Sequence, residues 1–214
     1  MPKLRELCFV GSNIVRNDDR IFESLKRRKR VLTRLKLRDT AISSRAYYSF
    51  AALVRSGYLR KLSVSANPYF ETFPLPSEPK KPFTIGTLLQ GGGQSPHEQA
   101  RQNVLKALFS APSLQEVRLG VGSLGTGDLF GTIKANFTGR KLELTGFDFK
   151  TVSNASLKET KWACSASLEI FSLSDPLNAT TDKLRSLVSS LKELKNLKDL
   201  NLNGIGSLDG LSTG

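Results

Sequence analysis

Histidine, cysteine, tryptophan and methionine are nearly absent from this 214-residue chain, which has one His, two Cys, one Trp and one Met. Its two cysteines, Cys8 and Cys164, lie far apart, which excludes a zinc finger, a CxxC redox motif and a disulfide-rich scaffold. No apolar run approaches the roughly 18 residues that a membrane span needs, and the first residues lack the apolar core of a signal peptide. We therefore expect a soluble protein of the cytoplasm or nucleus.

The groups that usually carry catalysis are also scarce. The single histidine, His97, follows Pro96 in a segment rich in Pro and Gly, and no Ser or Cys forms a recognisable catalytic motif with it. Cysteines such as Cys8 and Cys164 are more often small buried apolar residues than nucleophiles. No carboxylates have the spacing of metal ligands. The sequence thus predicts a non-enzymatic chain without a cofactor or a metal ion.

Positive charge is abundant and unevenly placed. The chain has 32 Lys and Arg against 19 Asp and Glu, a formal net charge of +13. Residues 1–66 hold 16 Lys and Arg against 5 Asp and Glu, an excess of 11, whereas residues 67–214 hold 16 against 14, an excess of 2. The basic run 26–30 has two interpretations. It is either the end of a helix containing Phe22 and Leu25, where cations are favoured, or a nuclear-import or nucleic-acid patch.

A short repeat of the form Leu-x-x-Leu-x-Leu, with other apolar residues allowed, runs through the chain. Its first positions are separated by 28, 27, 55, 25, 29 and 29 residues. Because 55 is about twice the other offsets, we expect a hidden copy between residues 67 and 111, with residues 83–88 as the candidate. The copies begin at Leu4, Leu32, Leu59, Leu114, Gly139 (a degenerate copy), Leu168 and Leu197.

Each copy predicts a short strand, because its last two apolar residues alternate with polar ones and so lie on one face. Between copies, residues 41–57, 98–110 and 181–194 have the apolar spacing of helices. Gly57 is suited to end the first of these helices, and Thr180 or Thr181 to begin the last. One strand-and-helix unit cannot bury its apolar side alone, so stacked units are expected. An ordinary α/β domain with chance clustering of leucines is the alternative.

In motif and period the chain resembles leucine-rich-repeat proteins, and units of 27–29 residues with a helix are similar to the ribonuclease-inhibitor-like subclass. The Asn that the family usually has three residues after the last leucine of the motif is found cleanly only at Asn67. Its absence from the other copies is similar to the irregular repeats of F-box/leucine-rich-repeat proteins, although no F-box is recognised. The resemblance implies one domain over residues 1–214: a curved solenoid of about 7–8 repeats, with parallel strands on the concave face and helices on the convex face. It also implies that the chain recognises another protein. In F-box proteins that partner is a substrate, which is recruited to a ubiquitin ligase. Because the chain begins inside a repeat at Leu4, a fragment of a longer protein is one interpretation.

Residues 67–96 interrupt the repeat with six prolines and a run of three glycines at 91–93. This composition predicts an exposed loop insertion rather than a second domain. Its three aromatic residues, Tyr69, Phe70 and Phe73, are candidates for partner binding. The alternative is that these rings pack back onto the repeats.

The strand residues that alternate with the buried ones form the predicted binding surface on the concave face. They change from basic in the second repeat to polar and slightly acidic in the last, which favours a protein partner with an acidic surface. Nucleic-acid binding by the basic first third is the alternative function, and side chains that only face solvent are the simplest interpretation. The candidate residues are Arg34, Lys36, Arg38, Lys61, Arg118, Lys141 and Asn201.

Overall fold

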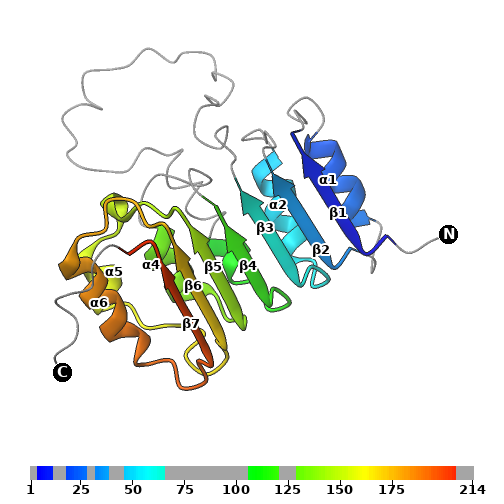
Figure 1. Cartoon of the computed structure of the whole chain (residues 1–214). Helices are drawn as coiled ribbons and strands as arrows, with labels where there is room; N and C mark the ends of the chain where they lie inside the picture. Colours follow the sequence, from blue (N-terminus) through cyan, green and yellow to red (C-terminus); the bar gives the residue numbers. More distant parts are fainter. Residues whose placement is uncertain are drawn as a thin grey trace, which may run out of the picture.

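The computed structural model describes residues 4–11, 18–27, 32–38, 46–65, 106–120 and 129–205. Its centre is one sheet of seven strands, each paired in parallel with the next along the chain. Figure 1 shows the strands side by side in chain order. This confirms an α/β fold with an all-parallel sheet. The strands are β1 (Glu6–Val10), β2 (Arg34–Arg38), β3 (Lys61–Ser65), β4 (Glu116–Leu119), β5 (Lys141–Thr145), β6 (Ile170–Ser174) and β7 (Asp199–Asn203).

The register of the sheet coincides with the sequence repeat. The first residues of neighbouring strands are register partners, as Glu6 is of Arg34 and Arg34 of Lys61. The spacings of these partners along the chain are therefore the offsets of the sequence repeat. The degenerate copy that begins with Gly139 joins the sheet in the same register, through the pair Glu116 and Lys141. Every copy identified in the sequence is thus a strand of the sheet.

The same pair of hydrogen bonds recurs at every junction between neighbouring strands. The carbonyl oxygen of Arg5 accepts from the backbone N–H groups of Thr33, at 2.9 Å, and Arg34, at 3.0 Å. A carbonyl oxygen has two lone pairs, so one acceptor satisfies two donors that lie side by side. This repetition makes the strand units geometrically equivalent. The corresponding carbonyls at the other junctions belong to Thr33, Arg60, Gln115, Arg140 and Glu169.

The predicted hidden copy between residues 67 and 111 is wrong, because β3 pairs directly with β4 and no strand separates them. The double offset instead reflects one long connection between neighbouring strands. Such a connection adds little to the cost of pairing, because loop-closure entropy grows only slowly with length. The candidate segment, residues 83–88, lies outside the described residues.

Helices occupy the connections between strands, and Figure 1 shows α1 and α2 on one side of the sheet. The predicted helices near the basic run and over 41–57 and 181–194 are confirmed, and residues 106–109 of the one over 98–110 are helical. Gly57 ends α2 with a φ of +84°, and the Thr180 hydroxyl caps α6 by accepting from the Lys183 N–H. The helical segments are α1 (Asp18–Arg27), α2 (Ala46–Arg55), α4 (Leu129–Asn136), the 3-10 helix η3 (Phe149–Thr151), α5 (Asn154–Lys158) and α6 (Thr181–Leu191).

The apolar core lies between the sheet and these helices. Leu35 and Leu37 of β2 are fully buried, and the rings of Phe22 in α1 and Phe50 in α2 pack with centroids 5.3 Å apart. Of the leucines that begin each copy, Leu32, Leu59, Leu114 and Leu168 are buried, whereas Leu4 is exposed. None of the helices that the structure describes has both the length and the apolar character that crossing a membrane requires.

One lysine, Lys134 of α4, is buried within this core. Its ammonium group donates to the carbonyl oxygens of Leu157, at 2.9 Å, and Ser156, at 3.3 Å, near the end of α5. It also lies 5.3 Å from the ring centroid of Trp162. Burial lowers the pKa of Lys134, and the charge of Glu193 opposes that shift. Lys134 therefore supplies donors to helix-terminal carbonyls that would otherwise lack them.

Candidate binding face

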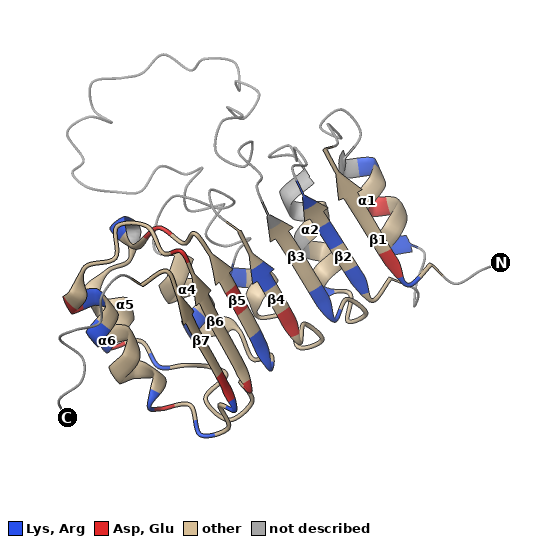
Figure 2. Ribbon diagram, viewed as in Figure 1, with Lys and Arg blue, Asp and Glu red and all other residues tan. Residues whose placement is uncertain are grey.

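The face of the sheet opposite the helices, called here the open face, consists of the alternate strand residues that point away from the core. On β2, for example, Arg34, Lys36 and Arg38 are exposed while the two leucines between them are buried. In Figure 2 the ribbons of β1–β5 carry residues of both charge signs, with Lys and Arg in blue and Asp and Glu in red. The open face is therefore the charged face of the sheet.

The register arranges these side chains in rows that run across the strands. The row of first strand residues contains Arg34, Lys61 and Lys141, with Glu116 between the two lysines. The next row contains Lys36 and Arg118, separated by Ser63. Arg38 lies on β2, and Asn201 lies on β7, two strands beyond β5. The structure thus brings the predicted cations together on β2–β5 and leaves Asn201 apart from them.

Five of the predicted residues line a shallow hollow of about 320 Å³ on β2–β5. Glu116 and Glu143 line it as well, so the hollow carries charges of both signs. The predicted binding residues Tyr69, Phe70 and Phe73 lie outside the described residues, as does His97. The predicted residues at the hollow are Arg34, Lys36, Lys61, Arg118 and Lys141.

Three glutamates of the open face each bridge two cations. Glu6 of β1 pairs with Lys36 at 2.7 Å and with Arg34 at 3.4 Å. Glu116 pairs with Lys61 at 2.7 Å and with Arg140 at 3.1 Å. Glu143 accepts from Nε of Arg118 at 2.6 Å and lies 3.4 Å from the ammonium of Lys141. These bridges link neighbouring strands and hold the long side chains in place.

The bridges keep the glutamates ionised. Burial alone would raise the pKa of Glu116, but the hydrogen bonds from Lys61 and Arg140 outweigh it and lower that pKa. The pKa of Glu143 is likewise lowered, because Arg118 and Lys141 outweigh the effect of burial. Hydrogen bonding to Lys36 is the main cause of the lowered pKa of Glu6. The open face therefore carries fixed charges of both signs at neutral pH.

A larger open groove, of about 1170 Å³, lies where β1–β5 begin. The residue before the strand is arginine in β1, β3 and β5, and these three residues, Arg5, Arg60 and Arg140, all line the groove. Sequence reasoning missed all three because it considered only positions within the strands. The recurrence of arginine just before alternate strands was visible in the sequence and would have indicated them.

The two cysteines differ in environment. Cys164 is fully buried, as expected, and burial raises the pKa of its thiol to about 12. Cys8 is exposed on β1, where its register partner is Lys36, and so differs from the buried state that is usual for cysteine. The alternation of β1 explains the difference, because Cys8 lies between the inward-facing Leu7 and Phe9.

Two further observations concern ligands and known relatives. Within the part of the chain that the structure describes, no three His, Cys, Asp or Glu side chains come together as metal ligands would. Comparison of the chain with protein-family models, with curated proteins and with solved structures found no match in any of the three.

Proposed function

We propose that the chain is a leucine-rich-repeat protein of the ribonuclease-inhibitor-like type and that its open face recognises another protein. Three observations support the repeat assignment. Each copy of the motif is a strand, the copies of β2–β6 bury equivalent strand residues, and one hydrogen-bond pattern joins all neighbouring units. Stacked units of this kind offer an extended surface made of many short strands.

The observation that carries the proposed function is the placement of Glu6, Glu116 and Glu143 between the cations of the open face. A surface with a fixed pattern of both signs selects a partner with the complementary pattern, because like charges brought together cost several kcal/mol. A continuous phosphate backbone has no positive groups to place against these glutamates. The pattern therefore favours a folded or extended protein partner over a nucleic acid.

The basic run 26–30 also fits this proposal better than a nucleic-acid site. Lys26 and Arg27 form the last turn of α1, and Lys26 pairs with Glu23 at 3.6 Å. The described part of the run thus has the character of a helix end that favours cations; residues 28–30 lie outside the described residues. Substrate recognition for a ubiquitin ligase, which the resemblance implies, stays a prediction.

The experiment that tests the proposal is affinity capture with a blocked open face. The variant Ser63→Arg/Ser172→Arg adds bulk and positive charge on β3 and β6, at open-face positions of the second row. The control Ser189→Arg adds the same side chain at an exposed position of α6. Each tagged chain is recovered from an extract of its own cells, with and without nuclease, at two salt concentrations.

A protein partner bound through the open face is captured by the wild-type chain and the control after nuclease treatment, and is lost from the blocked variant. A nucleic-acid ligand gives the opposite result. Added arginines would increase its capture, and nuclease or salt would abolish it, because phosphate contacts release counterions. That second result would overturn the proposal.

A further inference from the structure

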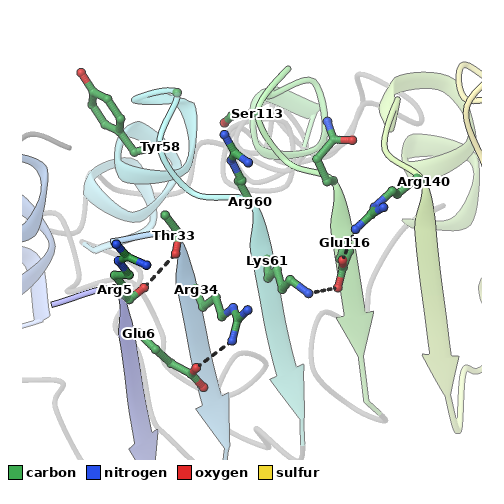
Figure 3. Close-up of a pocket in the computed structure, with 12 residues that line it drawn as sticks. Arg5, Glu6, Thr33, Arg34, Tyr58, Arg60, Lys61, Ser113, Glu116 and Arg140 are labelled. Atoms are coloured by element: carbon green, nitrogen blue, oxygen red, sulfur yellow. Dashed lines mark hydrogen bonds and ion pairs between the residues drawn. The ribbon is translucent and has the colours of Figure 1, made fainter. Parts of the chain in front are cut away.

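We propose that the groove at the start of β1–β3 binds a phosphorylated side chain of the partner protein, held by Arg5, Arg34 and Arg60. The inference rests on the proposed function, because it assigns a chemical class to part of the same partner. It concerns the edge of the sheet where the strands begin, and of the three arginines only Arg34 is among the binding positions predicted from the sequence. Figure 3 shows this edge.

Two of the three arginines have no carboxylate partner among the described residues. The side chains of Arg5 and Arg60 are exposed, and neither takes part in an ion pair within the described part of the chain. Within the described part of the chain, the single ion pair of Arg34 is its 3.4 Å contact with Glu6, which lies closer to Lys36, at 2.7 Å. The groove therefore contains guanidinium groups whose charge the described residues leave wholly or partly unneutralised.

The strand spacing allows these three side chains to reach one ligand. Neighbouring strands lie about 4.8 Å apart, so residues at equivalent positions of β1 and β3 lie roughly 10 Å apart, with β2 between them. Figure 3 shows Arg5 and Arg60 on either side of Thr33, the residue before β2. The proposed place for the anionic group is therefore over Thr33 and Arg34, between Arg5 and Arg60.

The charge of the groove fits a phosphoryl group better than a carboxylate. Its lining residues include five cations, Arg5, Arg34, Arg60, Lys61 and Arg140, against the two carboxylates of Glu6 and Glu116, a formal excess of three. A phosphorylated side chain carries a charge of about −1.5 to −2 and three strong acceptor oxygens. Arginine forks match such oxygens in pairs, and clusters of arginine are a recurring mode of phosphopeptide recognition.

Other residues of the groove support a ligand with hydrogen-bonding oxygens. The hydroxyl of Ser113, which lines the groove, is buried and has no hydrogen-bond partner among the described residues. A buried hydroxyl without a partner is unfavourable, and an acceptor oxygen that reached it would satisfy it. At the other end, Glu116 binds both Lys61 and Arg140. Because Glu116 neutralises charge at that end, the unneutralised positive charge of the groove is confined to β1–β3. A single phosphoryl group needs no more than this short region, whereas a long polyanion would need a longer one.

The test compares peptide ligands and charge-matched variants of the full chain. The probes are a fluorescent pentapeptide with a central phosphoserine, the same peptide with serine or glutamate, inorganic phosphate as competitor, and a fluorescent oligothymidine. The variant Arg5→Gln/Arg60→Gln removes two exposed charges that form no ion pair in the described part of the chain, so the fold is not expected to suffer. The control Lys158→Gln/Lys195→Gln removes two exposed charges elsewhere and has the same net charge.

We expect the phosphoserine peptide to bind about tenfold more tightly than the glutamate peptide. Inorganic phosphate displaces it, and the arginine variant weakens it by about tenfold or more while the control does not. Equal binding of the phosphoserine and serine peptides would overturn the proposal, as would equal loss in both variants. Preference for oligothymidine over the phosphopeptide, lost in the arginine variant, would assign the groove to nucleic acid. If the phosphopeptide fails but the blocked open face still loses its protein partner, only the present inference falls.

Discussion

The ring of Phe137 occupies the space that a side chain at residue 139 would need, and Gly139 leaves that space free. A Cβ atom added to Gly139 would meet the Phe137 ring and would lie 2.6 Å from the carbonyl oxygen of Gln115. The other copies of the repeat begin with leucine at this position, and Phe137 is fully buried here. Phe137 thus fills the corner that leucine fills elsewhere, which explains the degenerate copy.

This relationship predicts that Gly139→Ala destabilises the fold. The added methyl group forces either the ring or the backbone of the neighbouring repeat to move, and such overpacking costs about 1–3 kcal/mol. Urea denaturation measures the change, with Thr138→Ala at the exposed neighbouring position as control. A variant as stable as the control would show that the corner is not tightly packed.

Lys134→Met is expected to destabilise the chain although methionine is apolar and of similar length. The substitution leaves the carbonyl oxygens of Ser156 and Leu157 without the ammonium donor, and unsatisfied buried acceptors cost about 1–3 kcal/mol. Thermal unfolding is compared with Lys158→Met, an exposed lysine of α5. Equal melting temperatures would mean that the buried ammonium group contributes nothing.

Acid is expected to weaken the bridges of the open face. The pKa values of Glu116 and Glu143 in the folded state lie below the ordinary value of 4.5. Their contribution to stability is therefore present above pH 4.5 and is lost as the pH falls through the folded-state values. Glu116→Gln/Glu143→Gln should cost about 1 kcal/mol near neutral pH and progressively less as the pH falls below 4.5 through the folded-state values.

Urea denaturation midpoints across this pH range provide the measurement, with the exposed Glu159→Gln of the α5 end as control. The denaturation midpoint of the double variant should differ from that of the wild-type chain less in acid than near neutral pH. A difference that is the same at both ends of the range would contradict ion pairing as its cause.

The two thiols should react very differently in the folded chain. Cys8 is exposed, whereas Cys164 is buried and the pKa of its thiol is raised to about 12, so little reactive thiolate forms. A maleimide is expected to label Cys8 alone in native buffer and both cysteines in denaturant. Mass spectrometry of proteolytic peptides assigns the label, and modification of Cys164 under native conditions would contradict the packing of the core.

The sequence predicts the sheet well because the repeat and the register have one physical cause. Leucines at alternate positions are buried on one face, and a slip of one residue would expose them all. The prediction of a hidden copy was wrong because an offset of 55 residues fits two repeat units or one long connection equally well. The burial of Lys134 could not be predicted, since a lysine in a helix is ordinarily exposed to solvent.

The open face is predictable only in part. Alternation places Arg34 and Lys36 correctly, but the pairing of Glu116 with Lys61 depends on which strands become neighbours and on side-chain conformations. The groove residues Arg5, Arg60 and Arg140 were missed because they lie just before the strands, where alternation gives no direction for a side chain.

The central claim, recognition of a protein through the open face, is tested most directly by photocrosslinking from Cys8. A benzophenone maleimide is attached to Cys8 in the otherwise unchanged chain, and to residue 189 of α6 in a Cys8→Ser/Ser189→Cys variant. After irradiation in nuclease-treated extract of the protein's own cells, we expect one protein to crosslink from Cys8 and not from residue 189. Crosslinking of that protein from residue 189 alone, or to nucleic acid when nuclease is omitted, would contradict the account.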